Sequence, residues 1–138
     1  MLALLDEGRR RLVDTLRKRM ARAASPTERV RAWVEGVLAL TQPAAAARTR
    51  PWVMSELRLA ELFPEQQRAS VGLLTELLEE PLAALRGARK TDASDAATAA
   101  MVYRLTFSAL RDHLVASTKP DVKEIEALTG FCLRGAAR

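Results

Sequence analysis

Apolar residues recur along most of this chain at the three- and four-residue spacing of amphipathic helices. Val30, Trp33 and Val37 follow this spacing, and so do Leu74 and Leu78 further along. We find no sustained alternation of apolar and polar residues, and β-branched and aromatic residues are sparse. The pattern therefore predicts an all-α fold of about six helices, arranged as one domain over residues 1–138.

Residues suited to helix N-termini mark where several of these helices begin. Ser25-Pro26-Thr27-Glu28 has the form of a capping box, in which Ser25 accepts a backbone N–H and Glu28 reaches back. Asp92 and Asp121 also carry side-chain oxygens that can cap a helix. These residues predict the starts of the second helix and of the last two.

Prolines and one glycine divide the middle of the chain. Ala44–Ala47 reads as a short turn or the entry to a helix, and Arg50-Pro51-Trp52 predicts the start of the third helix. Pro64 suits the first turn of a fourth helix, which should kink or stop at Pro81 because proline lacks an N–H and its ring clashes with a carbonyl. Gly87 suits the end of that helix.

The predicted helix from Asp95 to Ser117 carries two separate apolar arcs, although a helix on one small core needs only one. The first arc contains Tyr103, Phe107, Leu110 and Leu114, and the second contains Met101, Val102, Leu105 and Ala109. The last helix, from Val122 to Arg134, also has a wide apolar arc. We therefore expect these two helices to form a homodimer interface, the alternative being burial at the centre of a monomer. Candidate interface residues are Met101, Val102, Leu105, Ala109, Leu110, Leu114, Ile125, Leu128, Phe131 and Cys132.

Composition narrows the class of protein. The chain has 138 residues, of which 49% are hydrophobic, and it contains only six Gly and six Pro, as expected for a globular domain. No apolar run approaches the length of a membrane span, and the first residues lack a secretory pattern. Cys132 is the only cysteine, so we expect no disulfide and no thiolate metal site. These features predict a cytoplasmic protein with no membrane partner.

The net charge of +5 is unevenly distributed, because seven basic residues lie between Arg9 and Arg22. Such a cluster can contact nucleic acid or a membrane surface. Here, however, the basic side chains are scattered around a helix, and no aromatic residue lies among them to stack on bases. A solvated helix face is the favoured interpretation.

Three stretches resemble the regulatory domain of the TetR family of transcriptional regulators. Leu4-Leu5-Asp6-Glu7-Gly8-Arg9-Arg10-Arg11-Leu12 resembles the linker helix that follows the DNA-binding domain, and Arg50-Pro51-Trp52 with Phe63-Pro64-Glu65 resembles the middle of the regulatory domain. The helices from Asp95 to Arg134 are similar to the pair that forms the family's dimeric four-helix bundle. The family's helix-turn-helix signature is absent from this chain. The resemblance implies a ligand-binding and dimerisation domain that contacts DNA only through a domain missing from this chain.

In that family a small molecule binds among the middle helices and changes the spacing of the DNA-binding domains. The resemblance therefore implies a largely apolar effector and no cofactor. Candidate residues for its pocket are Trp33, Val37, Trp52, Leu57, Leu74, Leu77, Arg104 and Phe107. Ordinary core packing is the alternative for the apolar members, and pairing with Asp112 or Glu124 is the alternative for Arg104.

Two other function classes stay open. His113 is the only histidine, no acid or nucleophile is placed beside it by the sequence, and Cys132 lies on an apolar arc. No metal-ligand spacing, phosphate loop or nucleophile elbow is present. We therefore predict no catalytic residue and no metal site, and we expect no enzyme. The alternatives are a helical dimerisation module without ligand and a small Arg-rich enzyme acting on an anionic substrate, somewhat like a chorismate mutase.

Overall fold

A computed structural model describes residues 2–137, with side chains from Asp6 onward; Leu4 and Leu5 of the linker-like stretch lie outside the described side chains. Within this range the secondary structure is entirely helical, which confirms the all-α prediction. The elements are α1 (Leu2–Ala21), α2 (Pro26–Leu38), the 3₁₀ helix η1 (Ala39–Thr41), α3 (Pro43–Met54), α4 (Glu56–Leu62), α5 (Pro64–Leu85), α6 (Ala93–Ala116) and α7 (Val122–Ala136).

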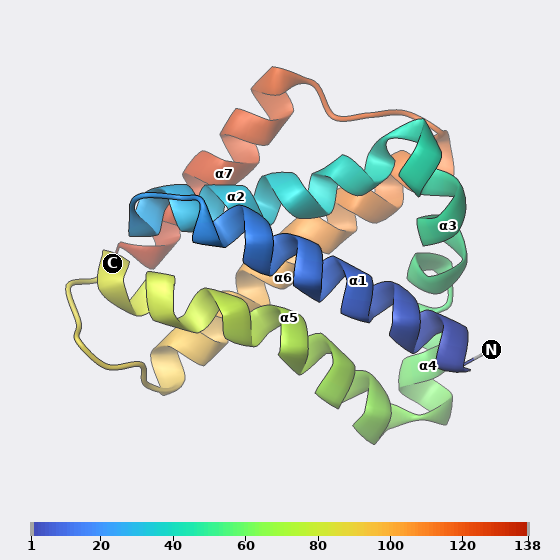
Figure 1. The fold of residues 1–138 in the computed structure, drawn as a ribbon, viewed down its shortest axis with the longest axis horizontal. Helices are drawn as coiled ribbons and strands as arrows, with labels where there is room; N and C mark the ends of the chain where they lie inside the picture. The colour runs from blue at the N-terminus through green and yellow to red at the C-terminus, as the bar shows by residue number, and fades with distance from the viewer. Residues whose placement is uncertain (1, 138) are drawn as a thin grey trace.

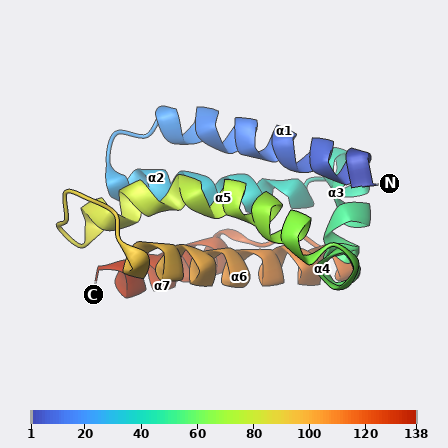
Figure 2. The ribbon, with the colours of Figure 1, turned by 90° about the horizontal axis from the view of Figure 1, so that it is seen from below.

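The long helices are stacked in layers. Figure 2 shows α1 as one outer layer, α2 and α5 in the middle, and α6 with α7 as the other outer layer. The short helices α3 and α4 close the end of the molecule near the N-terminus (Figure 1). Leu16 of α1, Val34 of α2, Leu78 of α5 and Leu110 of α6 are all fully buried, so one core runs through the layers.

The two apolar arcs of α6 have different surroundings. Tyr103, Phe107, Leu110 and Leu114 are buried in the core of the protomer. Leu110 and Leu114 are therefore core residues, and their prediction as interface residues is wrong. They face inward because α2 and α5 pack against that side of α6.

The second arc of α6 and the arc of α7 are partly exposed. Met101, Leu105 and Phe131 are 53%, 36% and 60% exposed, whereas Val102 and Cys132 are buried between them. The remaining interface candidates, Ala109, Ile125 and Leu128, are half-buried against the core. Burial also raises the pKa of the Cys132 thiol to about 11, which keeps it protonated at neutral pH.

The predicted helix caps are present. Ser25 Oγ accepts from the Glu28 N–H at 3.1 Å, and Glu28 reaches back to the Ala24 N–H, one residue earlier than predicted. Asp92 accepts from the Ser94 N–H at 2.8 Å, and Asp121 accepts from the Glu124 N–H at 2.8 Å. The starts of α2, α6 and α7 are therefore set by local side-chain chemistry.

The middle of the chain differs from its prediction. The third helix begins at Pro43, not at Arg50, and the alanine run after Pro43 is the entry to this helix, which was one of its two predicted roles. Pro51 lies inside α3, which ends at Met54, so the expected third helix is divided into α3 and α4. Similarly, α5 continues through Pro81 to Leu85, so the stop, one of the two outcomes predicted at this proline besides a kink, is wrong. Proline removes one backbone hydrogen bond, and burial of the Pro81 ring against the core offsets that loss.

The helices α1 and α2 approach each other closely at Gly36. A Cβ added to Gly36 lies 2.5 Å from Leu16 Cδ2 and 3.1 Å from Arg19 Cδ. Real Cβ atoms do not approach carbon so closely, and Leu16 is fully buried, so its side chain has little room to move. Glycine at this position therefore sets the distance between α1 and α2.

Gly36→Ala should accordingly lower the free energy of unfolding by about 1 kcal/mol or more, because overpacking outweighs the gain in helix propensity. The matched control is Gly72→Ala in α5, where an added Cβ meets only Glu76 Oε1 at 3.9 Å. This control should raise stability by about 0.5–1 kcal/mol. Urea unfolding followed by circular dichroism measures both. Equal stabilisation by the two variants contradicts the close approach.

Candidate functional site

An aromatic cluster occupies the centre of the core. The ring of Phe107 lies 6.4 Å from Trp33, 6.1 Å from Trp52 and 4.3 Å from Tyr103, measured between ring centroids. Trp33 is fully buried, and its Nε1–H donates to the Leu74 carbonyl at 3.1 Å. The cluster joins α2, α3, α5 and α6 and leaves these aromatic side chains in contact with one another.

The predicted pocket residues are not gathered around one cavity. Trp33, Val37, Leu74 and Phe107 are close-packed in the core, and Leu77 is half-buried against it. None of these five lines any of the cavities described below. The structure therefore assigns these five residues to core packing.

The other three predicted pocket residues lie apart from that group. Trp52 is buried near α1, whereas Leu57 on α4 is 75% exposed. Arg104 is exposed on α6, with its Nη1 3.9 Å from Met101 Sδ, and it lines none of the cavities described here. The prediction of Arg104 as a pocket residue is therefore wrong, because Arg104 lies on the surface. Of the eight predicted pocket residues, only Leu57 lines the cavity proposed below as the effector site.

A buried polar network lies beside the aromatic cluster. The Tyr103 hydroxyl on α6 donates to Glu56 Oε1 on α4 at 2.7 Å. Arg9 Nη2 on α1 donates to the same oxygen at 3.3 Å. Arg9 is only 2% exposed and Glu56 9%, and the Arg9 guanidinium carbon lies 5.8 Å from the centre of the Trp52 ring. One carboxylate oxygen therefore links three helices that are distant in the sequence.

The electrostatics of the network keep its hydrogen bonds in place. Burial and the negative charge of Glu56 raise the pKa of Tyr103 far above its usual range. The phenol therefore stays protonated and acts as a donor at any physiological pH. The network therefore joins the carboxyl group of Glu56 to two donors, the Arg9 guanidinium and the Tyr103 phenol.

Glu56 and Tyr103 also line a cavity of about 420 Å³, which we call the α4–α6 cavity. Its walls are mainly apolar, with a few polar side chains. Glu56 Oε2 accepts no hydrogen bond from the described residues, so it is free to accept one from a ligand. The lining residues are Val53, Met54, Glu56, Leu57, Ala60, Gln67, Val71, Tyr103 and Arg111.

The sequence interpretation missed Arg9, Glu56 and Tyr103 as site residues, although the signal was present. Arg9 occupies the same helical stripe as Leu12 and Leu16, and Glu56 shares a stripe with Val53. Charged residues of opposite sign at positions expected to be apolar are candidates for a buried ion pair. Sequence alone does not reveal that these two stripes face each other.

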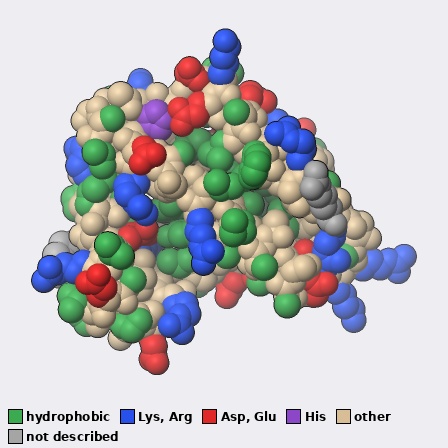
Figure 3. Space-filling view, turned by 180° about the vertical axis from the view of Figure 1, so that it is seen from behind, with side chains coloured by type: hydrophobic (Ala, Val, Ile, Leu, Met, Phe, Trp, Pro, Cys, Tyr) green, Lys and Arg blue, Asp and Glu red, His purple; other side chains and the backbone are tan. Residues whose placement is uncertain are grey.

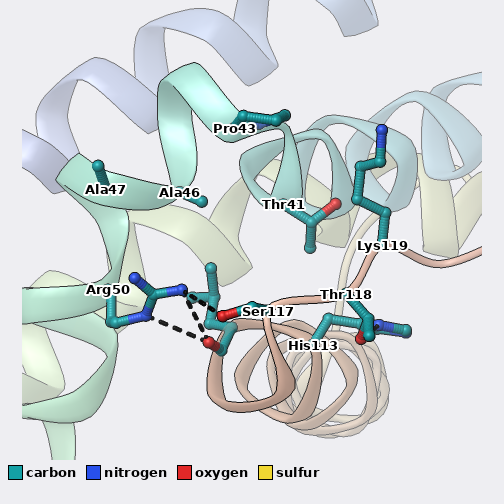
Figure 4. A pocket seen from close by; sticks show the side chains of 10 residues that line it. Thr41, Pro43, Ala46, Ala47, Arg50, His113, Ser117, Thr118 and Lys119 are labelled. Carbon is teal, nitrogen blue, oxygen red and sulfur yellow. Dashed lines mark hydrogen bonds between the residues drawn. The ribbon is translucent and has the colours of Figure 1, made fainter.

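A second cavity, of about 320 Å³, lies where α3 meets the C-terminal end of α6 (Figure 4). Two cationic side chains, Arg50 and Lys119, line it, and Arg50 donates through Nε and Nη2 to the Leu114 carbonyl at 3.2 and 3.0 Å. Arg50 thereby caps α6 just before Ser117, whose φ of 56° is left-handed. His113 bridges Thr118 and Glu124. Arg50 and His113 are therefore paired within the chain and connect α3, α6 and α7 at this cavity.

Comparisons with known proteins do not assign this chain to a family. No family model, no curated protein and no solved structure matches the chain. Among the helices of residues 2–137, none is long and apolar enough to cross a membrane. The features of the chain that indicate a function are therefore the buried network, the α4–α6 cavity and the exposed side of α6 and α7.

Tyr103→Phe should lower the free energy of unfolding by about 1–3 kcal/mol, because it removes a donor from a buried carboxylate. Ser108→Ala, on the exposed side of the same helix, is the matched control and should change stability by less than about 0.5 kcal/mol. Thermal and urea unfolding measure both variants. A Tyr103→Phe variant as stable as the control contradicts the assigned hydrogen bond.

Proposed function

We propose that this chain is the regulatory domain of a TetR-like transcriptional regulator, which forms a homodimer and binds a small-molecule effector. The observation that carries the proposal is the exposed apolar face shared by α6 and α7, the two helices that resemble the family's dimerisation helices. DNA contacts belong to a domain outside this chain.

The apolar face is defined by Met101, Leu105 and Phe131, which border a shallow groove of about 170 Å³ floored by Val102 and Cys132. Hydrophobic side chains gather across the middle of the face formed by α6 and α7 (Figure 3). Single exposed apolar residues are ordinary, but a contiguous apolar patch on two adjacent helices favours an interface.

In a homodimer with two-fold symmetry, this face of one protomer packs against the same face of its partner. In such a dimer, α6 and α7 of each protomer pack against the same helices of the partner, and four helices form a bundle. A stable interface of this type buries about 1,200–2,000 Å² in total. Two helices of 24 and 15 residues are long enough to supply a face of that size.

The α4–α6 cavity is the proposed effector site. Its apolar walls suit a largely apolar molecule, and Glu56 Oε2 suits a hydrogen-bond donor on that molecule. Because Glu56 also holds Arg9 of α1, an effector that bonds to Glu56 weakens the tie between α4 and α1. α1 is the helix that resembles the family's linker to the DNA-binding domain, so this tie connects the effector site to that linker.

A helical dimerisation module without a ligand is the second candidate function. It is favoured by the close packing of Trp33 and Phe107, two of the side chains that the sequence predicted to line the effector pocket. Both candidates share the dimer, so a dimerisation experiment tests what they have in common. A ligand experiment separates them.

Phe131→Glu should convert a wild-type dimer into a folded monomer, because the change places a charge in the middle of the apolar face. Leu62→Glu is the matched control, since Leu62 is similarly exposed on α4, away from α6 and α7. Sedimentation equilibrium at micromolar concentration measures the mass of each. A wild-type chain that is monomeric under these conditions overturns the homodimer.

Amphipathic small molecules with one donor group should raise the melting temperature of the wild-type chain by occupying the α4–α6 cavity. Ala60→Trp, at the exposed rim of the cavity, should abolish this shift by filling the space. Ala47→Trp, at the rim of the second cavity between α3 and the C-terminal end of α6 (Figure 4), is the control and should leave the shift unchanged. If no compound from a broad panel shifts the wild type, the dimerisation module replaces the regulatory domain.

A further inference from the structure

A third cavity lies between α1 and α3, and the charged side chains that line it are all positive. This α1–α3 cavity has a volume of about 210 Å³. It shares no lining residue with the α4–α6 cavity or with the cavity at the C-terminal end of α6. Its walls include Gly8, Arg11 and Thr15 of α1 and Arg48 and Trp52 of α3.

One edge of the Trp52 indole ring borders this cavity beside Gly8. A Cβ added to Gly8 would lie 3.2 Å from both Cδ1 and Nε1 of the indole. Because Gly8 has no side chain, this edge of the ring stays uncovered at a point where both residues line the cavity. The ring as a whole is only 5% exposed, so the cavity gives access to an otherwise buried indole.

The Nε1–H of Trp52 has no acceptor among residues 6–137, whereas that of Trp33 donates to the Leu74 carbonyl at 3.1 Å. Among the same residues, the unpaired side-chain atoms that are fully enclosed are Arg9 Nε and Thr129 Oγ1. Trp52 Nε1 is therefore unpaired without being enclosed. An N–H in a mostly buried ring gains a hydrogen bond when an acceptor enters the cavity.

Two guanidinium groups lie at the same cavity. Arg11 Nη2 pairs with Glu7 at 3.2 Å, but both side chains are more than half exposed, so this pair is weak. Arg48 forms no ion pair with any residue from 6 to 137. The cavity walls therefore carry two positive charges and no negative one.

These donors and the remaining walls indicate the chemistry of a ligand. Guanidinium groups match the oxygens of carboxylates and phosphates, and the Thr15 hydroxyl adds an uncharged donor. Two positive charges without an acid favour a dianion over a monoanion. Leu12 and Leu40 provide an apolar wall, which suits an organic group attached to that dianion.

We propose that the α1–α3 cavity binds a small phosphate monoester, whose phosphate oxygens contact Arg11 and Arg48 and accept the Nε1–H of Trp52. This site is separate from the proposed effector site and does not depend on the proposed function. The bound phosphate contacts side chains of both α1 and α3, so occupancy of the cavity holds these two helices together.

The indole N–H signals of the full chain test the hydrogen bond directly, because the chain contains only two tryptophans. In a nitrogen–proton correlation spectrum, phenyl phosphate should move the Trp52 indole signal downfield as its N–H gains an acceptor. The Trp33 signal should stay in place, since that N–H is already bonded to Leu74. Trp52→Phe assigns the two signals. A Trp52 signal that does not move at millimolar phenyl phosphate overturns the proposal.

Calorimetric titration with three probes tests the ligand class. Phenyl phosphate is a dianion above about pH 6, benzenesulfonate carries one charge on the same ring, and inorganic phosphate lacks the ring. We expect phenyl phosphate to bind about tenfold more tightly than either of the others. Equal binding of benzenesulfonate overturns the dianion site, and equal or tighter binding of inorganic phosphate overturns the ester assignment.

Variants locate the binding at this cavity. Arg48→Gln should weaken phenyl phosphate binding about tenfold, while Arg58→Gln, at an exposed arginine on α4, should bind like the wild type. Gly8→Ala keeps both arginines and covers the indole edge with a methyl group, so it should also weaken binding, whereas Gly72→Ala should not. A folded Arg48→Gln or Gly8→Ala chain with wild-type affinity overturns the proposal.

Discussion

Burial of one side of α6 is the constraint on which the rest of the structure depends. Phe107 contacts three other aromatic rings from that side, and Leu110 and Leu114 extend the buried strip toward the end of the helix. Once this strip faces α2 and α5, the opposite side of α6 must face outward. The exposed apolar residues Met101 and Leu105 are a direct consequence, and the proposed homodimer rests on them.

The contact between the buried charged residues depends on this packing. Arg9 and Glu56 come from α1 and α4, and they meet only because both helices pack against the end of the core near Trp52. Two charges taken out of water need well-placed partners, and Glu56 has Tyr103 as well as Arg9, whereas Arg9 keeps an unpaired Nε. Glu56 therefore ties α1 and α6 to α4 and also lines the α4–α6 cavity.

Prediction from sequence succeeded where the decisive interactions are local. The caps at Ser25, Asp92 and Asp121 form as expected, because each depends on residues within three or four positions. It placed the start of the third helix at Arg50, although α3 begins at Pro43 and the alanine run is the entry to it, and a stop at Pro81 is wrong, because tertiary packing sustains a helix that proline alone disfavours. Local propensity is weak beside such packing, so proline marks a possible boundary without fixing it.

The all-α class and the two apolar arcs of α6 were determined by the sequence itself, because helical periodicity is a property of neighbouring residues. Which arc faces the core was decided by tertiary structure, since both arcs are apolar and only packing against α2 and α5 distinguishes them. The same holds for the site. Arg9 and Glu56 each stand out in their own helical stripe, but their pairing across 47 residues exists only after α1 and α4 have packed at the same end of the domain.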